Sequence, residues 1–316
     1  MAILYRSGIQ FYGFLVKFSA FWSKKAALFT KGRKDWKSHL ISLLKGKENI
    51  IWFHVASLGE YEQALPLIEK LQVNKPEKNI LISFFSPSGY ENAKIPDYVI
   101  GKVYLPLDSK KNAKDFIGIC NPELAVFVKY DIWYYYLNEL KERKIEAVLI
   151  SSLFRENQIY FKSYGSVLRE ALACFDKIYV QNSDSKKLLS KINIDSELSG
   201  DTRYDRVNSR LQNIKTNSVI NSFKGDSKIF LIGSSWMDDL NIIMDEVNKL
   251  RDFKVIIAPH NVGRSEIDTV DSKLKMKCER YSAIRSEHDV IDLQALIIDN
   301  IGMLAMLYST ADLAYV

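Results

Sequence analysis

Cysteine is scarce in this chain of 316 residues, and its three copies, Cys120, Cys174 and Cys278, are odd in number and far apart. Without a CxxC pair, neither a disulfide framework nor a thiolate zinc site is supported, which fits a reducing, cytosolic compartment. The four histidines are scattered and form no metal-ligand spacing with acidic residues. We therefore expect no metal site and no cofactor.

Long apolar runs and the common nucleotide-binding motifs are also missing. The longest uncharged run near the N-terminus, Ser7 to Val16, is too short to cross a bilayer, and no signal-peptide cleavage site follows it. No GxxxxGK[ST], GxGxxG, HExxH or GxSxG occurs, so P-loop, kinase, dinucleotide-binding and common hydrolase classes lack support. The low glycine and proline content and the absence of a fixed-period repeat argue against linkers and solenoids.

Positive charge is concentrated at the N-terminus, in a segment that is also apolar. Residues 1–47 carry a net charge of +9, whereas the rest of the chain sums to −3, so we expect no nucleic-acid partner. The apolar residues at helical spacing are Leu4, Phe11, Leu15, Phe18 and Trp22, with Ile3, Tyr12, Phe14 and Phe21 beside them. We expect residues 1–45 to form a basic amphipathic arm on an anionic membrane surface. The alternative is a first helix packed on the domain, with a solvated basic tail.

After Gly46, short apolar runs alternate with helical stretches. The expected strands are Ile50–Ala56, Ile80–Phe85, Lys102–Leu105, Leu124–Val128, Ala147–Ser151, Lys177–Gln181, Glu197–Gly200, Ile229–Gly233, Lys254–Ala258, Ala295–Ile298 and Leu313–Val316. This alternation predicts parallel sheets with right-handed crossovers, the doubly wound α/β class. Ligands of such folds bind at the carboxyl ends of the strands.

The polar stretch over residues 206–227 separates two such blocks. We expect a Rossmann-like domain over residues 46–205, a linker over 206–227 and a second Rossmann-like domain over 228–316. Two such domains that face each other across a cleft form the GT-B architecture. Because the chain stops inside an apparent strand with no following helix, we expect the second domain to be incomplete.

The first strand of the body ends in HVASLGE, which places Ser57 and Gly59 in a strand-to-helix turn and Glu60 near the helix start. A carboxylate there can act as a general base or can simply stabilise the helix. His54, inside the strand, is expected to be a satisfied core histidine.

The next two strands also end in polar residues. In SFFSPSG, residues Ser86, Ser88 and Gly89 precede a short helix, where they can bind an anion or only cap the helix. In VKYDIW, Asp131 is expected at the same sheet edge as Glu60. The aromatic residues that follow can line a ligand site or belong to the core.

Later strands are followed by candidate anion-binding loops. Arg203 can pair with a phosphate or can merely be solvated beside the linker. The candidates on these loops are Gly200, Arg203, Ser234, Ser235, Pro259, His260, Gly302 and Met303.

The order of these motifs resembles the 3-deoxy-D-manno-octulosonic acid (Kdo) transferase family. The matching segments are HVASLGE, SFFSPSG, PELAVFVKYDIW, QNSD, GDTRYD, GSS, APH and DNIGMLAMLYSTADLAYV. Three positions depart from the family pattern: Asp131 replaces a more usual Glu, Arg203 replaces a Lys, and Trp236 stands where His is common.

The resemblance implies an inverting, metal-independent glycosyltransferase that moves Kdo from CMP-Kdo to a lipid A precursor in lipopolysaccharide synthesis. Glu60 would be the catalytic base and Asp131 the second acid. The acceptor would bind at Ser57, Gly59, Ser86, Ser88 and Gly89. The donor would bind at the eight loop candidates Gly200, Arg203, Ser234, Ser235, Pro259, His260, Gly302 and Met303. The protein would be a monomer at the cytoplasmic face of the inner membrane, peripheral or anchored by its N-terminus.

Two other functions remain open at this point. Another GT-B nucleotide-sugar transferase or epimerase would share the fold, and a non-catalytic membrane-surface module would need neither Glu60 nor Arg203.

Overall fold

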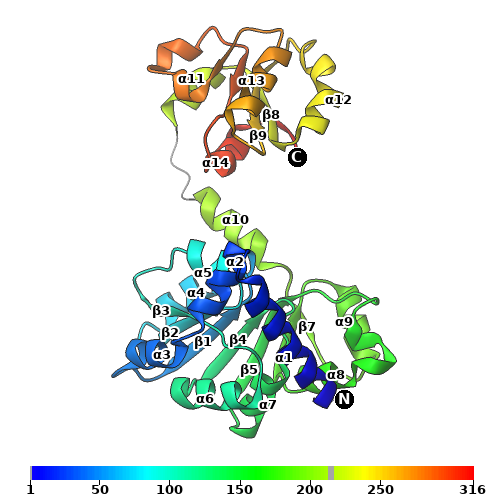
Figure 1. Cartoon of the computed structure of the whole chain (residues 1–316). Coiled ribbons are helices and arrows are strands. Elements are labelled where there is room, and N and C mark those ends of the chain that lie inside the picture. Colours follow the sequence, from blue (N-terminus) through cyan, green and yellow to red (C-terminus); the bar gives the residue numbers. More distant parts are fainter. Residues whose placement is uncertain (1, 213–216) are drawn as a thin grey trace. The chain divides into compact units, whose positions relative to one another are not determined.

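A computed structural model describes residues 2–212 and 217–316, which form two compact units, Met1–Arg206 and Val207–Val316. Each unit is built around its own parallel sheet, and the chain runs from the first unit into the second through helix α10 (Thr202–Gln212) (Figure 1).

The first unit contains a seven-stranded sheet in the order β3-β2-β1-β4-β5-β6-β7, with every pair parallel. The strands are β1 (Ile50–Val55), β2 (Asn79–Phe84), β3 (Val99–Tyr104), β4 (Leu124–Val128), β5 (Glu146–Ser152), β6 (Lys177–Val180) and β7 (Glu197–Leu198). The order reverses between β1 and β4, which is the usual ligand-binding position of a doubly wound sheet.

Helices cover both faces of this sheet. They are α4 (Leu58–Asn74), α5 (Pro87–Asn92), α6 (Lys110–Cys120), α7 (Tyr134–Glu142), α8 (Ser166–Leu172) and α9 (Ser183–Ser190), with 3-10 turns at Ile159–Phe161 and Ser163–Gly165. Short polar side chains cap several of them: Ser109 accepts a hydrogen bond from the Asn112 backbone N–H, and Asn182 accepts one from Ser185.

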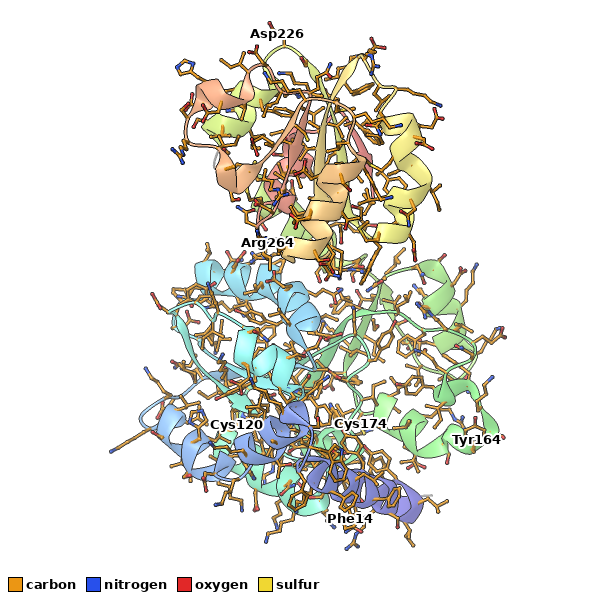
Figure 2. The ribbon with its side chains drawn as sticks, turned by 45° about the horizontal axis from the view of Figure 1, so that its top comes forward. Phe14, Cys120, Tyr164, Cys174, Asp226 and Arg264 are labelled. Carbon is orange, nitrogen blue, oxygen red and sulfur yellow. The ribbon has the colours of Figure 1, made fainter. Side chains whose placement is uncertain are left out.

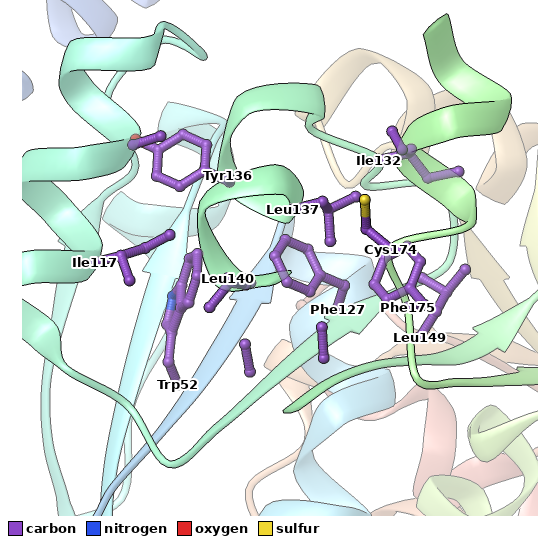
Figure 3. Close-up of a cluster of buried hydrophobic side chains, with 14 of the residues drawn as sticks. Trp52, Ile117, Phe127, Ile132, Tyr136, Leu137, Leu140, Leu149, Cys174 and Phe175 are labelled. Atoms are coloured by element: carbon purple, nitrogen blue, oxygen red, sulfur yellow. The ribbon is translucent and has the colours of Figure 1, made fainter. Parts of the chain in front are cut away.

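The strands are apolar along their length because both faces of the sheet are buried. Trp52 and Phe127 point to one side, into a cluster shared with α6 and α7 (Figure 3). Phe53 and Val126, their neighbours in sequence, point to the other side and pack with α4. This alternation is the period-2 pattern of a strand, with apolar residues required at every position.

The N-terminal segment differs from the single arm expected over residues 1–45. It forms α1 (Ala2–Ser19), α2 (Lys24–Gly32) and α3 (Trp36–Leu44). Trp36, Leu40 and Leu44 are buried in the core of the first unit, so α3 belongs to the domain body. The physical reason is that their i, i+4, i+8 spacing presents an apolar stripe to the sheet.

Helix α1 is docked by one hydrogen bond and by ring contacts, and it keeps its apolar stripe outside. The Tyr5 hydroxyl donates to Asp108 Oδ2 at 2.6 Å, and Tyr12 packs its ring near Phe29 and Phe85. Phe14 lies on the outer side of α1, at the margin of the first unit (Figure 2). The exposed apolar residues of the segment are Ile3, Leu4, Phe11, Tyr12, Phe14, Leu15, Phe18, Phe21 and Trp22. Within residues 2–212 and 217–316, no helix combines the length and apolar character that a membrane crossing requires.

The second unit holds a five-stranded parallel sheet in the order β10-β11-β9-β8-β12. Its strands are β8 (Lys228–Ser235), β9 (Phe253–Pro259), β10 (Cys278–Arg280), β11 (Ala295–Ile297) and β12 (Leu313–Tyr315). Its helices are α11 (Ser218–Lys224), α12 (Met237–Val247), α13 (Arg264–Lys273) and α14 (Leu304–Thr310), with 3-10 turns at Tyr281–Ala283 and Glu287–Val290. The sequence did not predict β10, because its three residues include two charged ones at the sheet edge.

The expected linker over residues 206–227 also differs. Residues 213–216 lie outside the described part of the chain, but α10 and α11 occupy much of the rest. Ile220 and Phe223 are fully buried in the core of the second unit, so α11 belongs to that unit. Two apolar residues in a polar stretch were enough to hold this short helix in place.

The docking of α1 predicts a measurable loss of stability. Asp108 is buried and accepts hydrogen bonds from the Tyr5 hydroxyl and from the backbone N–H groups of Tyr135 and Tyr136. Asp108→Ala should lower the free energy of unfolding by about 2–4 kcal/mol, because it leaves three buried donors without an acceptor. Tyr5→Phe, which removes one donor, should cost about 1 kcal/mol. Urea unfolding measures the free energy of unfolding of both variants. The control is Tyr164→Phe, at an exposed tyrosine, which should change this free energy little.

Candidate active site

The carboxyl ends of β1, β2, β4 and β5 meet at one edge of the first unit, because these strands are parallel neighbours. The chain turns from β1 into α4 at Ala56 and Ser57, and Ser57 adopts an extended conformation just before the helix. Glu60 therefore lies in the first turn of α4, as the sequence predicts, where the helix dipole favours a negative charge.

Two groups contact the Glu60 carboxylate. The Ser57 hydroxyl donates a hydrogen bond to Oε2, and the Lys129 ammonium lies 3.8 Å from Oε1. Lys129 follows β4 directly and holds a left-handed backbone conformation (φ +62°), which turns the chain sharply at this edge. The Glu60 side chain keeps 17% of its surface exposed, so a substrate hydroxyl can reach it.

Asp131 lies at the same edge but is almost entirely buried. Burial raises the pKa of Asp131 well above its usual range, and the charge of Glu60 raises it further, while the Ala56 backbone N–H and Lys129 act in the opposite direction. Its Oδ2 atom lies 3.7 Å from His54 Nε2 and has no hydrogen-bond partner within the described residues. The raised pKa favours the protonated form of this side chain over the ionised one.

His54 is fully buried and neutral, since burial lowers its pKa to about 3. Its Nε2 accepts a hydrogen bond from Trp133 Nε1 at 2.9 Å, so the ring proton sits on Nδ1 and is donated to Ser83 Oγ at 2.8 Å. Ser83 also accepts from Trp52 Nε1 at 2.7 Å. The histidine is the satisfied core residue that the sequence suggests, and its one lone pair is already used by Trp133, so it does not take the proton of Asp131.

The two acids thus differ in environment although they share one edge. Glu60 is partly exposed and lies beside an ammonium group, whereas Asp131 is buried and its pKa is raised. Pairs of carboxyl groups whose environments differ in this way are typical of acid–base sites.

The loop after β2 brings Ser86, Ser88 and Gly89 next to this pair. Ser86 caps α5, since its Oγ accepts from the Ser88 backbone N–H at 3.3 Å and lies 2.8 Å from the Ser88 hydroxyl. A Cβ at Gly89 would lie 2.9 Å from the Ser57 carbonyl carbon, so only glycine allows α5 to approach the start of α4. Gly59, by contrast, has room for a side chain.

Arg203 is held at the start of α10. Gly200 has φ +82°, a conformation that favours glycine, and directs the chain into this helix. Asp201 accepts hydrogen bonds from Arg203 Nε at 2.7 Å and from Gln63 of α4 at 2.9 Å. The ion pair raises the pKa of Arg203, and its side chain remains 62% exposed. A further hydrogen bond joins the hydroxyl groups of Thr202 and Ser151, whose oxygen atoms are 2.8 Å apart.

The remaining predicted donor residues lie in the second unit, at the carboxyl ends of β8 and β9 or before α14. Ser234 has φ +56° and its hydroxyl lies 3.1 Å from His260 Nδ1, directly after Pro259. Trp236 stacks on the His260 ring, with 4.0 Å between centroids. Ser235 is buried, and its hydroxyl has no partner in the described part of the chain. Gly302 (φ +104°) and Met303 lead into α14.

Three residues of the site were not among the sequence candidates: Gln63, Ser151 and Asp201. They are single polar residues inside strand, helix or loop segments, and no spacing distinguishes them from surface residues. Lys129 and Ser83, by contrast, lie in the segments VKYDIW and SFFSPSG that the sequence points to. Among the described residues, no three His, Cys, Asp or Glu side chains lie close enough together to hold a metal ion.

Comparison with known proteins gives one family. The model of the 3-deoxy-D-manno-octulosonic-acid transferase (kdotransferase) family matches residues 26–206. The 3-deoxy-D-manno-octulosonic acid transferase of Chlamydophila psittaci is 28% identical over 295 residues, which cover 86% of this chain and 64% of that protein. A bifunctional glycosyltransferase/methyltransferase of Fusobacterium nucleatum is 26% identical over 85% of this chain and 43% of its own length. The chain therefore spans only part of these relatives.

Solved structures similar to this chain share its fold at low identity. The UDP-GlcNAc 2-epimerase of Neisseria meningitidis, bound to UDP-GlcNAc, matches with a TM-score of 0.54 and 14% identity over 84% of this chain and 76% of that one. MurG of Acinetobacter baumannii matches with a TM-score of 0.51 and 10% identity over 84% and 73%. The predicted GT-B class is confirmed by these likenesses and by the two parallel sheets.

The raised pKa of Asp131 predicts a pH-dependent stability difference. Because the pKa of folded Asp131 is raised, its proton stabilises the fold fully below the unfolded pKa of about 3.9 and less as pH rises toward the folded value. Asp131→Asn cannot ionise, so its stability relative to the native chain should increase with pH by up to about 1.4 kcal/mol per unit in that window. Urea unfolding between pH 4 and 8 tests this; a constant difference would contradict it. Asp97→Asn, at an exposed carboxylate, is the control.

Proposed function

Because the chain belongs to the 3-deoxy-D-manno-octulosonic acid transferase family, we propose that it transfers Kdo from CMP-Kdo to a hydroxyl of a lipid A precursor in lipopolysaccharide synthesis. The observation that carries this proposal is the pair formed by the partly exposed Glu60 and the buried Asp131, whose pKa is raised, at the carboxyl edge of one sheet. Such a pair supplies a base and a hydrogen-bond donor side by side.

In the proposed reaction, Glu60 removes the proton of the acceptor hydroxyl. The acceptor oxygen forms a bond to the anomeric carbon of Kdo as the bond from that carbon to the CMP phosphate breaks, with inversion. The proton remains on Glu60, and CMP leaves with the electron pair of the broken bond. Ser57 and Lys129 orient the Glu60 carboxylate for this step.

Asp131 suits an anionic substrate because it holds its proton. The donor carries a phosphate and a sugar carboxylate, and a second ionised acid beside Glu60 would repel both groups. A protonated Asp131 instead donates a hydrogen bond, as buried carboxylic acids do in other enzymes. We propose that Ser57, Gly59, Ser86, Ser88 and Gly89 bind the acceptor around this pair.

Positive and polar groups are proposed to bind the departing nucleotide, in a reaction that needs no metal. Asp201 engages Nε and Nη2 of Arg203. Nη1 is proposed to bind a phosphate oxygen. The other proposed donor-binding residues are Gly200, Ser234, Ser235, Pro259, His260, Gly302 and Met303. The unpartnered hydroxyl of Ser235 supports this role, because a buried polar atom needs a partner.

The lipid-borne acceptor suggests where the protein works. We propose that the exposed stripe of α1 lies on the anionic cytoplasmic surface of the inner membrane and that the protein acts there as a monomer without nucleic acid. Phe14, Phe18 and Trp22 form a continuous aromatic row along this stripe. Aromatic side chains flanked by lysines are typical of interfacial helices.

The role of Glu60 is tested by Glu60→Gln. Transfer of labelled Kdo from CMP-Kdo to a lipid A precursor should fall by about 10²–10⁴-fold, because the amide cannot accept the proton. CMP-Kdo binding, measured by calorimetry, should be retained. Glu77→Gln, at an exposed glutamate, is the control. Near-normal turnover of Glu60→Gln would refute the role of Glu60 as the base. In the binding measurement, tighter binding of UDP-GlcNAc than of CMP-Kdo would favour an enzyme that uses a UDP-sugar.

Membrane attachment is tested by Phe14→Ser combined with Phe18→Ser. Both side chains point outward, so the fold should be retained while co-sedimentation with phosphatidylglycerol vesicles weakens by about 10–100-fold. Val73→Ser, at an exposed valine of α4, is the matched control. Unchanged co-sedimentation of the double variant would argue against α1 as the membrane contact.

A further inference from the structure

A cavity of about 660 Å³ lies between α1, α2 and the loop that precedes α6. Its lining residues are Gly13, Val16, Lys17, Ala20, Ala27, Phe29, Thr30, Lys31, Arg33, Lys34, Trp36, Pro106, Leu107 and Asn112. Its volume lies within the range of about 300–1,000 Å³ that is usual for small-molecule sites. The catalytic step proposed above does not use it.

The cavity has apolar walls and a basic mouth. Val16, Phe29 and Leu107 supply apolar surface, whereas Lys17 and Lys31 are exposed. Lys34, exposed as well, adds a third ammonium group, and no acidic residue lines the cavity. This distribution matches an amphiphile with an alkyl chain and an anionic head.

The walls are held rigidly by Arg33. Its guanidinium donates to the backbone carbonyls of Phe29 at 3.1 Å, Phe85 at 2.5 Å and Leu105 at 2.8 Å. It also stacks on the Phe29 ring, 3.5 Å from the centroid. These contacts join α2 to the ends of β2 and β3. A site that is formed before the ligand arrives loses less conformational entropy on binding.

A second hollow of about 240 Å³ borders the first cavity. It shares Val16 and Phe29 with that cavity and extends to Ser86 and Pro87. Ser86 is one of the proposed acceptor-binding residues at the start of α5. The two hollows therefore border the same pair of side chains, and the second is lined by a residue of the proposed acceptor site.

We propose that the 660 Å³ cavity binds an acyl chain of the lipid-borne acceptor, while Lys17, Lys31 and Lys34 bind the acceptor's phosphate. This inference rests on the proposed function, since it assumes an acylated, phosphorylated acceptor. The hollow at Ser86 favours the acceptor over a bulk phospholipid, because a chain lodged here lies beside the residues that would hold the reacting sugar. The cavity would thus select acylated acceptors and position their hydroxyl.

The first test uses simple probes, octyl phosphate and dodecyl phosphate, below their micelle concentrations. Affinity measured by calorimetry should rise by about fourfold for each added methylene that enters the cavity. Ala27→Trp, which places an indole in the cavity mouth, should abolish this chain-length dependence. The matched control is Ile41→Trp, at an exposed position on α3 outside the cavity lining. Equal chain-length dependence in the native chain and Ala27→Trp would overturn the proposal.

The second test concerns the head group. Lys31→Glu combined with Lys34→Glu should weaken dodecyl phosphate binding by at least tenfold, whereas Lys45→Glu combined with Lys47→Glu, of equal charge change and outside the cavity lining, should have a small effect. If the two double variants weaken binding equally, only the overall charge of the protein matters. That result would overturn the proposal that the lysines at the cavity mouth bind the phosphate.

The third test separates the acceptor from bulk lipid. In the transfer assay, the native chain should prefer an acylated acceptor over the same acceptor with its acyl chains removed. Ala27→Trp should reduce that ratio at least tenfold, mainly through KM, whereas Ile41→Trp should keep it. If phosphatidylglycerol displaces dodecyl phosphate as effectively as the acceptor does, the cavity does not distinguish the acceptor from bulk lipid. That result would overturn the proposal that the cavity binds the acceptor. If no Kdo transfer occurs at all, the proposed function fails, while the probe binding still decides whether the cavity binds acyl chains.

Discussion

The burial of Asp131 at the carboxyl end of β4 is the constraint on which the candidate site depends. A carboxylate removed from water is costly, so burial raises the pKa of this group, and the nearby charge of Glu60 raises it further. His54 does not relieve the cost, because its accepting nitrogen is occupied by Trp133 and its donating nitrogen by Ser83. One edge of the sheet therefore carries a partly exposed carboxylate after β1 and a buried acid with a raised pKa after β4. The proposed transfer reaction rests on this difference between the two acids.

The same edge of the sheet is connected to the N-terminal helices through Arg33 and Asp108. Arg33 binds the carbonyls at the ends of β2 and β3, and Asp108 joins α1 to the start of α7. Burial raises the pKa of Asp108 to about 6, while the hydrogen bonds from the Tyr5 hydroxyl and from the backbone N–H groups of Tyr135 and Tyr136 lower it. Because the Tyr5–Asp108 hydrogen bond and the ring contacts of Tyr12 fasten the inner side of α1, its apolar stripe is left for another surface. Membrane contact, acyl-chain binding and catalysis would then lie along one continuous part of the first unit.

Much of the fold could be predicted from local pattern. All eleven expected strands are present, with Leu124–Val128 at its observed bounds, because fully buried parallel strands read as short apolar runs between helical segments. The missed strand, Cys278–Arg280, lacks such a run and exists only because Ala295–Ile297 offers it an edge. The sequence prediction assigned residues 20–45 to an arm and residues 218–224 to a linker, because both segments are polar on average. Tertiary packing nevertheless buries single apolar residues in them, such as Trp36 and Phe223.

The sequence by itself determined which side chains reach the carboxyl edge of the first sheet, because parallel strands end together and Glu60, Ser86 and Asp131 each follow one. Only the tertiary structure decided their states. The raised pKa of Asp131, the tautomer of His54 and the contact between Lys129 and Glu60 depend on burial and on partners from other strands. Likewise, the stripe on α1 is visible in the residues, but the cavity beside α1 arises from the packing of α1 and α2 against the loop that precedes α6. Electrostatic environment and enclosed volume are properties of assembled neighbours, and no single segment encodes them.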